Sequence, residues 1–521
     1  MAKVYLDALL PREDFEAEET ETSMKKKESF SISDIRETDF FYRSLRKPDF
    51  QRETNEWDPK RVVQLVKSFV DGELIPAIIL WHSKSGLSFV IDGSHRLSSL
   101  IAWINDDYGS GTTSKTNLQG LVPEEQIAAA ARTRKLVEKQ VGRYSDYVLA
   151  ASSPEKVAPE IAARAKKLGA LAVQLQWVEG NAQTAETSFF NINQQAVKIN
   201  ETELKLIKSR KRPNGIAARA IIKEGQSHHY WSKFSQEVSE QIEELSHELS
   251  DLMFLPKLKN PVKTLDLPIG GKGYSAQSPL LVFELVNAVN NVGTSELNED
   301  IDGAVAVQFL KNTLKVVRRV NSLHPSSLGL HPAVYFYSRG GRHKSASFSA
   351  IIEFLIELDS KRLLKEFTSI RSIFEDILLD DDYIPEQILR HHRTAAKAVP
   401  HITTYFRHLM EHLLAAKKIP NFTIVNDDVV REVLSKKEYR FVKTVAVENE
   451  SSEGESFSDE TKSAVFITEA LQRAIRCKIC NARMHINSIT IDHIQRKSEG
   501  GTAALDNAQV AHPFCNTTVK H

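Results

Sequence analysis

The residues with the clearest capacity for chemistry lie in the last part of the chain. Its only three cysteines, Cys477, Cys480 and Cys515, fall within one short window of a 521-residue sequence. The Cys-x-x-Cys pair places two thiolates on one side of a tetrahedron, and His512-x-x-Cys515 supplies two further ligands. We therefore expect a structural zinc site of the Cys3His kind, because a module this small gains little stability from its core alone.

The sequence alone leaves two questions about this zinc site open: whether the thiols bind a metal, and which histidine is the fourth ligand. Three buried free thiols are one alternative, but the clustering of all the cysteines argues against it. The fourth ligand is a second open point, because His485 or His521 could stand in the place of His512. An odd number of cysteines in a long chain also argues against a disulfide framework.

Residues that could hydrolyse a phosphodiester lie between the expected zinc ligands. Residues 489–494 alternate like a strand that must end or bend at Asp492 and His493, since a regular strand would place these side chains on opposite faces. His493 is suited to be the general base that activates water, although an ordinary surface histidine is the alternative. A hard divalent ion, held by oxygens of Asp492 and Asn516, would neutralise the phosphate and help the leaving oxygen. Asn507 is suited to brace the connecting loop through hydrogen bonds to the backbone.

On these residues the segment resembles the HNH (ββα-metal) endonuclease family in its zinc-containing form. The resemblance implies that Asp492 and Asn516 bind a catalytic Mg²⁺ or Mn²⁺ and that DNA is the substrate. It also implies that His493 is the general base and that Asn507 is the central asparagine of the motif. Two positions depart from the commoner pattern, which has histidine in place of Asn516 and cysteine in place of His512.

A second group of candidate residues surrounds a glycine turn after an expected strand at 87–91. The turn opens a helix, and free backbone N–H groups at such a point attract anions. His95 and Arg96 could add charge-assisted hydrogen bonds to a phosphate. The alternative is a structural turn, in which Asp92 caps the helix and Arg96 pairs with an acidic neighbour. The candidate nucleotide-binding residues are Asp92, Gly93, Ser94, His95, Arg96, Gln51 and Arg52.

This turn resembles the Asp-Gly-Gln-Gln-Arg or Asp-Gly-Gln-His-Arg signature of the ParB/sulfiredoxin-like domain in GmrSD-type restriction enzymes. Pro48-Asp-Phe-Gln-Arg52 and the Asn-rich run after Phe190 resemble the earlier and later motifs of that domain. Ser94 and His95 stand where Gln-Gln is commoner. The resemblance covers roughly residues 30–210, and it implies a domain that binds or hydrolyses a nucleoside triphosphate and helps to sense modified DNA.

The patterns along the chain predict an α+β protein of several domains. Strand-like and helix-like segments alternate in the first part, helical periodicity dominates the middle, and an acidic, Ser-rich run precedes the cysteines. The expected parts are a flexible tail (1–30), a ParB/sulfiredoxin-like α+β domain (31–210), a mainly helical domain (211–445), an acidic linker (446–463) and a small zinc-stapled ββα-metal HNH module (464–521).

Composition limits the classes of function without choosing among them. Lys plus Arg equals Asp plus Glu, at 68 each, so a DNA-binding face would have to come from local clustering of charge. No stretch approaches the roughly 20 apolar residues of a membrane span. The first residues lack the apolar region of a signal peptide, so we expect a cytoplasmic protein without a membrane partner.

These observations favour a metal-dependent DNA endonuclease of the prokaryotic restriction or anti-phage kind, whose front domain senses nucleotide or modified DNA. The alternative is a non-catalytic, nucleotide-switched regulator that binds nucleic acid through a structural zinc finger. Asp492, His493, Asn507 and Asn516 argue against it, because a zinc staple needs none of them. RNA is a further candidate target. One HNH site cuts one strand at a time, so nicking or double-strand cutting depends on whether the protein forms a homo-oligomer.

Overall fold

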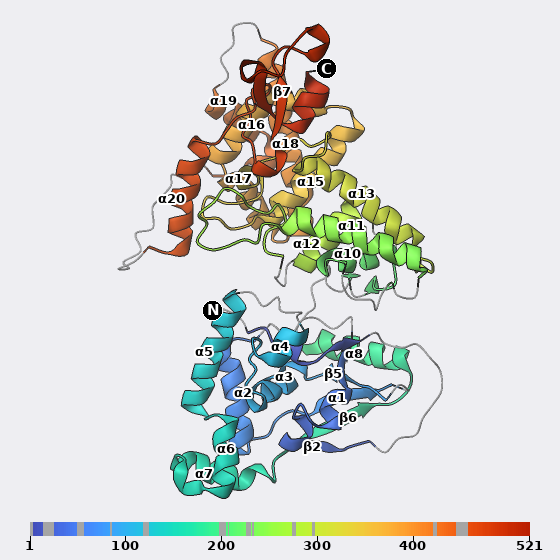
Figure 1. The fold of residues 1–521 in the computed structure, drawn as a ribbon, viewed down its shortest axis with the longest axis vertical. Helices are drawn as coiled ribbons and strands as arrows, with labels where there is room; N and C mark the ends of the chain where they lie inside the picture. The colour runs from blue at the N-terminus through green and yellow to red at the C-terminus, as the bar shows by residue number, and fades with distance from the viewer. Residues whose placement is uncertain are drawn as a thin grey trace. The chain divides into compact units, whose positions relative to one another are not determined.

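The computed structural model describes residues 4–13, 26–48, 57–83, 86–117, 124–196, 205–206, 208–225, 231, 234–273, 278–293, 297–419, 425–443 and 457–520. The chain divides into two compact units, Met1–Lys208 and Ser209–His521, whose elements are labelled in Figure 1. No helix among these residues is long and apolar enough to cross a membrane.

Unit 1 is built on a mixed sheet. Its described strands are β1 (Arg12–Glu13), β2 (Ser29–Ser31), β3 (Leu45–Pro48), β4 (Ile78–His82), β5 (Ser88–Asp92) and β6 (Ala172–Val178). They lie in the order β1-β3-β5-β4-β6-β2. The central β4 pairs antiparallel with β5 and parallel with β6, while β3 pairs parallel with β5. The predicted α+β class is therefore confirmed for this part of the chain.

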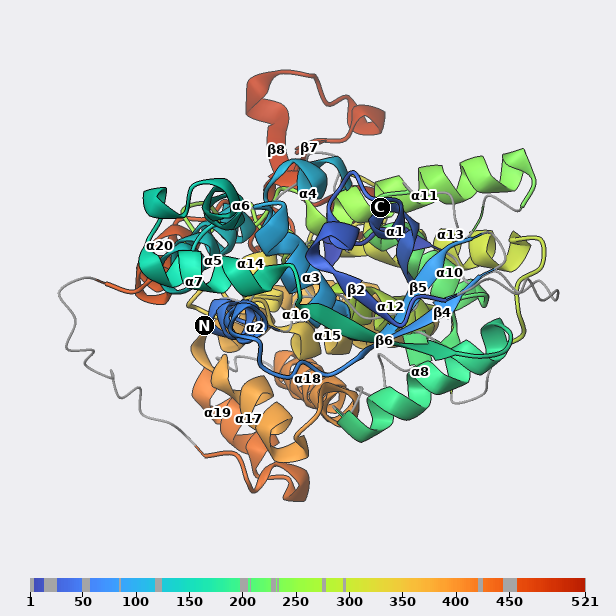
Figure 2. The same ribbon diagram turned by 90° about the horizontal axis from the view of Figure 1, so that it is seen from below.

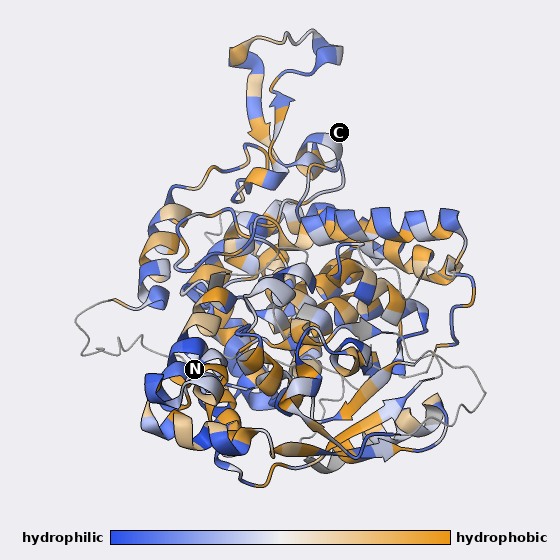
Figure 3. Cartoon of the chain, turned by 60° about the horizontal axis from the view of Figure 1, so that its bottom comes forward, coloured by the Kyte–Doolittle hydropathy of each residue, from blue (hydrophilic) through white to orange (hydrophobic). Residues whose placement is uncertain are grey.

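Helices cover both faces of this sheet because its central strands are apolar on both sides. The helices are α1 (Phe40–Ser44), α2 (Pro59–Asp71), α3 (Ser94–Ile104), α4 (Thr112–Asn117), α5 (Glu124–Gln140), α6 (Tyr144–Ser152), α7 (Pro159–Leu168) and α8 (Ala182–Ala196). Leu80 and Val90 belong to one core with residues of α2 and α3, whereas Trp81 and Phe89 belong to another with residues of α8. Figure 3 colours the strands as predominantly hydrophobic.

Helix α2 illustrates how local sequence sets an element. Asp58 is its N-cap, with a side chain that accepts a hydrogen bond from the Arg61 N–H, and Pro59 occupies the first turn. Gly72 ends the helix at φ 79°, a left-handed conformation that glycine adopts without strain. The buried face of Val62, Val66 and other apolar residues is the one that the periodicity predicts.

The expectation of a flexible tail over residues 1–30 is wrong for its described parts. Residues 4–13 contain a 3-10 turn (Asp7–Leu9) and strand β1, and Val4 and Leu9 are fully buried in the core of unit 1. Residues 29–30 begin strand β2, which pairs with β6. The prediction relied on the average charge of the segment, which hid a few apolar residues that pack at the sheet edge.

Unit 2 is mainly helical, as predicted. Its described helices are α10 (Pro213–Ile222), α11 (Gln236–Phe254), α12 (Ser278–Val289), α13 (Ala304–Val320), α14 (Pro332–Tyr335), α15 (Ser345–Ser360), α16 (Leu364–Asp380), α17 (Tyr383–His392), α18 (Ala395–Lys417), α19 (Asn426–Leu434) and α20 (Asp459–Gln472). The most extensive helix–helix packing is between α15 and α18 and between α11 and α13. Helix α20 begins inside the segment expected to be a linker.

The C-terminal module follows α20 within the same unit. Strand β7 (Thr490–His493) pairs antiparallel with β8 (Ala508–Ala511), with Asp492 opposite Gln509 and His493 opposite Ala508. The chain then ends in a short helical segment that includes the π-helical turn Cys515–Val519. The segment between the two strands extends away from the helices of unit 2 (Figure 2).

Candidate metal centre and nuclease site

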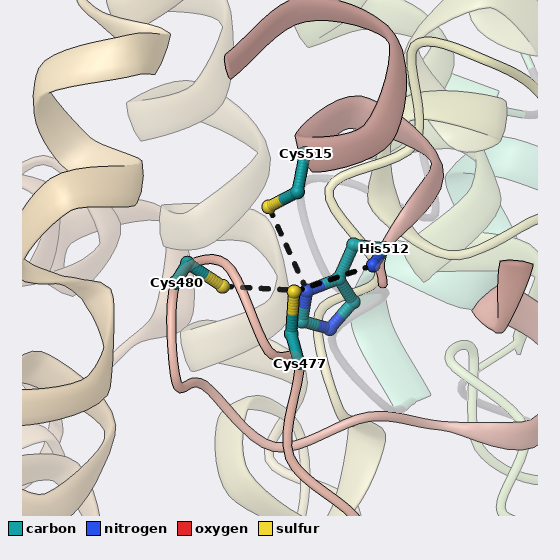
Figure 4. Close-up of side chains that lie close together, drawn as sticks. All are labelled: Cys477, Cys480, His512 and Cys515. Atoms are coloured by element: carbon teal, nitrogen blue, oxygen red, sulfur yellow. Dashed lines mark hydrogen bonds between the residues drawn. The ribbon is translucent and has the colours of Figure 1, made fainter. Parts of the chain in front are cut away.

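Four side chains of the C-terminal module converge on one point. The ligand atoms of Cys477, Cys480, His512 and Cys515 all lie within 4.8 Å of one another, and Figure 4 shows them turned inward. His512 Nδ1 is 3.4 Å from the Cys480 sulfur and 3.9 Å from the Cys515 sulfur. Three thiols and one imidazole at this spacing match the donor set of a structural zinc ion. The cluster can therefore hold a metal.

The ring of His512 is fixed in the orientation that a metal needs. His512 is fully buried, and its Nε2 lies 3.1 Å from the backbone oxygen of Arg483. Since a carbonyl oxygen only accepts, Nε2 carries the proton and the lone pair of Nδ1 faces the thiols. Burial, together with the nearby Arg371 charge, lowers the pKa of His512 and keeps the imidazole neutral.

The three thiols are too close to ionise together without a cation. Hydrogen bonds from Cys480 and Cys515 lower the pKa of Cys477, so the first negative charge falls on that sulfur. The Cys477 sulfur in turn raises the pKa of Cys480 to about 11 and also raises the pKa of Cys515. A bound divalent ion would remove this conflict, because it stabilises all three thiolates.

Of the other two histidines considered as ligands, the one that the structure describes, His485, does not enter this cluster. The ring of His485 is 2.9 Å from the Asn321 amide and 3.5 Å from an oxygen of Asp266, on the side of the helices. Burial lowers the pKa of His485 to about 4. His521 lies outside the described residues. Among the described residues, His512 is therefore the fourth donor of the cluster.

The oxygen-bearing residues of the expected nuclease site lie along and beside β7. Asp492 is 5% exposed, and its Oδ2 accepts hydrogen bonds from Gln509 Nε2 at 2.7 Å and from Lys520 Nζ at 2.8 Å. Asn516 contacts the same strand, with its amide 3.4 Å from the Thr490 hydroxyl. Both side chains can therefore reach the β7 end of the module.

His493 is the last residue of β7 and follows Asp492 in the regular ladder of β7 with β8, so the strand does not bend between these two residues as the sequence led us to expect. Its side chain is partly exposed. Among the described residues none forms a hydrogen bond or an ion pair with its imidazole, so the ring can engage water or a substrate. Such freedom is a precondition for a general base.

Asn507 braces the loop between the two strands. Its Oδ1 accepts from the Gln495 N–H at 2.7 Å, and its Nδ2 donates to the carbonyls of Gln495 at 3.1 Å and Thr502 at 2.7 Å. The Ile494 N–H also donates to the Asn507 carbonyl at 2.8 Å. These bonds are of the kind expected for a residue that positions the backbone next to His493.

A buried ion pair in the helical part supports the metal cluster, and no pattern in the sequence indicated it. Arg371 and Glu375, one turn apart on α16, are both fully buried and lie 2.9 Å from each other. Glu375 Oε2 accepts from the Arg483 N–H at 2.8 Å, while the Arg483 carbonyl accepts from His512. The helical part therefore orients a metal ligand through the backbone of one residue, Arg483, as outer-shell groups do in other metal sites. Charged residues within a helical pattern are usually read as surface, so only the packing could reveal this pair.

In the N-terminal turn, Asp92 and Arg96 form an ion pair with each other. Gly93, at φ 94°, is the N-cap of α3 and Asp92 makes no capping hydrogen bond. Arg96 Nη2 donates instead to Asp92 Oδ2 at 2.7 Å and to the Ala77 carbonyl at 3.0 Å. The His95 ring stacks on Trp57 with centroids 5.5 Å apart. The alternative interpretation was a structural turn in which Asp92 caps the helix and Arg96 pairs with an acidic residue. The ion pair of Arg96 is present, and the cap by Asp92 is absent.

The remaining candidates for nucleotide binding are Ser94, Gln51 and Arg52. Ser94 is buried in the first turn of α3. Gln51 and Arg52 lie outside the described residues, as does the later part of the Asn-rich run after Phe190. Of the candidate residues, the structure therefore brings Asp92 and Arg96 into direct contact.

An antiparallel hairpin followed by a short helix and stapled by three cysteines and a histidine defines a ββα-metal module. Comparison with protein families agrees: residues 477–521 match the HNH endonuclease family. Residues 32–210 match the N-terminal domain of the GmrSD restriction endonuclease. No curated protein and no solved structure matches the chain. The chain thus joins a GmrSD N-terminal domain to a C-terminal HNH endonuclease domain, and the two resemblances are confirmed.

Proposed function

We propose that this protein is a metal-dependent DNA endonuclease of the restriction kind, with its cutting site at the end of β7. The observation that carries the proposal is the conjunction of Asp492, His493, Asn507 and Asn516 on a hairpin stapled by the cysteine cluster. A structural zinc finger would need the cluster alone, so the four additional residues favour catalysis over the regulator.

Each residue has a distinct part in this proposal. Asp492 and Asn516 would hold a Mg²⁺ or Mn²⁺ ion, which supplies charge neutralisation at the phosphate and at the leaving oxygen. His493 takes a proton from the attacking water at an imidazole nitrogen. Asn507 keeps the backbone around His493 in place through its contacts with the loop. The zinc ion proposed for the cysteine cluster has only a structural role, because the protein supplies all four ligands and leaves no coordination position for water or substrate.

The test is cleavage of supercoiled plasmid by the full-length protein with Mg²⁺ or Mn²⁺. We expect nicked product with either ion and none with EDTA, provided that the zinc content is unchanged. Asp492→Asn should reduce nicking by on the order of 100-fold, since it removes the negative charge that binds the divalent ion most strongly. Wild-type nicking that persists in EDTA, or equal activity of the variant, would contradict the proposal. Parallel assays with RNA decide the target.

The N-terminal domain is proposed to control cutting by binding a nucleoside triphosphate at the Asp92–Arg96 turn. The support is the match to the GmrSD domain and the location of Arg96 beside a helix start, where phosphates bind well. Arg96→Ala should abolish nucleotide binding in calorimetry with a panel of triphosphates, whereas the exposed Arg132→Ala should not. A role in anti-phage defence is part of the same proposal, and restriction of modified and unmodified phage DNA would test it.

A further inference from the structure

Lys520 contacts the carboxylate that we assign to the catalytic ion. Its Nζ lies 2.8 Å from Asp492 Oδ2, and it also donates to the His493 carbonyl oxygen. The Lys520 side chain is 16% exposed and the Asp492 side chain 6%. Water therefore screens this pair only in part, and a charge at Lys520 acts strongly on whatever binds Asp492.

The surrounding backbone holds Lys520 in this place. The Lys520 N–H donates to the Cys515 carbonyl at 3.1 Å. The carbonyl oxygen of Lys520 accepts a hydrogen bond from the Arg496 guanidinium. The lysine is thus tied both to a ligand of the metal cluster and to the loop that follows β7. Its approach to Asp492 is set by the fold of the module.

The two donors that reach Asp492 use one of its two oxygens. Gln509 Nε2 and Lys520 Nζ both bond to Oδ2. Among the described residues none donates to Oδ1, so this oxygen is open to a metal ion. An ion at Oδ1 would lie a few ångströms from the Lys520 ammonium, and the two positive charges would repel each other. A phosphate oxygen nearby would offer the ammonium a better partner and relieve this repulsion.

We propose that Lys520 couples the binding of the catalytic ion to the binding of DNA. In the free protein its ammonium opposes a divalent ion at Asp492. When a phosphate of the substrate enters, Lys520 transfers its hydrogen bonds to a phosphate oxygen and the ion binds more tightly. The inference rests on the proposed function, and it adds a residue outside the motif that gave that function.

The test compares Mn²⁺ binding with and without a short DNA duplex, measured from the electron paramagnetic resonance of free Mn²⁺. Two proteins are compared, one with Lys520 and one with Lys520→Gln, and both carry His493→Ala to prevent cleavage. The Mn²⁺ bound by the duplex alone is subtracted. In the protein with Lys520 we expect DNA to tighten Mn²⁺ binding by about tenfold, a typical coupling between two sites. With Lys520→Gln, Mn²⁺ should bind about tenfold more tightly in the absence of DNA, and DNA should add little.

Two control variants separate this role from a structural one. Lys520→Arg keeps the charge and should behave as the lysine does. Lys497→Gln removes a charge from an exposed position of the same module and should leave Mn²⁺ binding without DNA unchanged. Zinc content, measured for every variant, reports whether the module is folded.

The outcomes distinguish the inference from the proposed function. Mn²⁺ affinity that is unchanged or weaker in Lys520→Gln, with zinc retained, overturns the coupling role and leaves the nuclease proposal standing. Mn²⁺ binding that is absent from the protein, or that survives Asp492→Asn unchanged, overturns both.

Discussion

At the scale of single residues, His512 shows how one hydrogen bond selects a metal ligand. Three histidines could have completed the cysteine set by sequence. The ring of His512 is directed to the thiols because its Nε2 donates to the Arg483 carbonyl, whereas the ring of His485 bonds to Asn321. Fixing one nitrogen leaves the other free for the metal.

This assignment predicts the effect of His512→Ala. Loss of one of four ligands should release the metal and destabilise the C-terminal module, since metal binding and folding are coupled in modules of this size. Metal analysis of the purified protein should find less than the wild-type amount of zinc. His247→Ala, at an exposed position of α11, is the control. Full zinc content in the His512 variant would contradict the assignment.

At the scale of elements, α16 is a support of the metal cluster as well as a member of the helical bundle. Glu375 lies between Arg371 and the Arg483 N–H, with both charges fully buried. The neighbouring Asp376 also pairs with Arg483, at 2.7 Å, but its side chain is 36% exposed. Two acidic residues of α16 thus bind Arg483, one from a fully buried position and the other from a partly exposed one.

The contrast between these two acids is testable. Glu375→Gln leaves the buried Arg371 without its counter-charge and should destabilise unit 2 by about 3 kcal/mol, while a chelator should remove the metal faster. Asp376→Asn removes a partly solvated pair and should cost less than about 1 kcal/mol. Urea unfolding and the rate of metal release measure both effects. Equal effects of the two substitutions would show that burial is not the deciding factor.

The loop before α15 gives unit 2 a dependence on pH. Burial lowers the pKa of His343 to about 4, and its Nε2 lies 2.9 Å from the Ile269 carbonyl. The folded state thus binds the proton less readily than the unfolded chain. The stability from the neutral ring is complete above the unfolded pKa, near 6.5, and is lost as the pH falls from there towards 4.

Between pH 8 and pH 5 this one group should therefore lower the free energy of unfolding by about 2 kcal/mol. His343→Gln, which cannot take up a proton, should show a correspondingly smaller loss over the same range in urea denaturation. The wild type is compared with His343→Gln because the thiols of the metal cluster also respond to acid, and their contribution is the same in both proteins. An identical loss in both would contradict the assignment.

At the scale of the whole molecule, the sequence predicted what depends on local patterns. The strands β4 to β6, the capped helix α2 and the cysteine cluster follow from periodicity, caps and spacing. It could not predict what depends on packing between distant segments. Examples are the apolar residues near the N-terminus that join the core of unit 1, and the pair of Arg371 and Glu375 beneath the metal cluster.

The same distinction applies to the nuclease site. The residue types and the resemblance to the HNH family suggested roles for Asp492, His493, Asn507 and Asn516, and these roles stay predictions. Asn507 makes hydrogen bonds to the loop of the kind expected for a bracing residue. Lys520 belongs to no motif, and it meets Asp492 only because the last turn of the chain folds back along β7. The helical middle, which the sequence left without a role, forms one compact unit with the HNH module.

The measurement that tests the central claim most directly is plasmid cleavage by His493→Ala. Among the described residues none forms a hydrogen bond or an ion pair with the His493 side chain, so its removal should leave zinc content and thermal unfolding as in the wild type. Loss of the general base should reduce the nicking rate with Mg²⁺ by at least on the order of 100-fold. A folded, zinc-loaded variant that nicks plasmid at the wild-type rate would show that the chemistry takes place elsewhere.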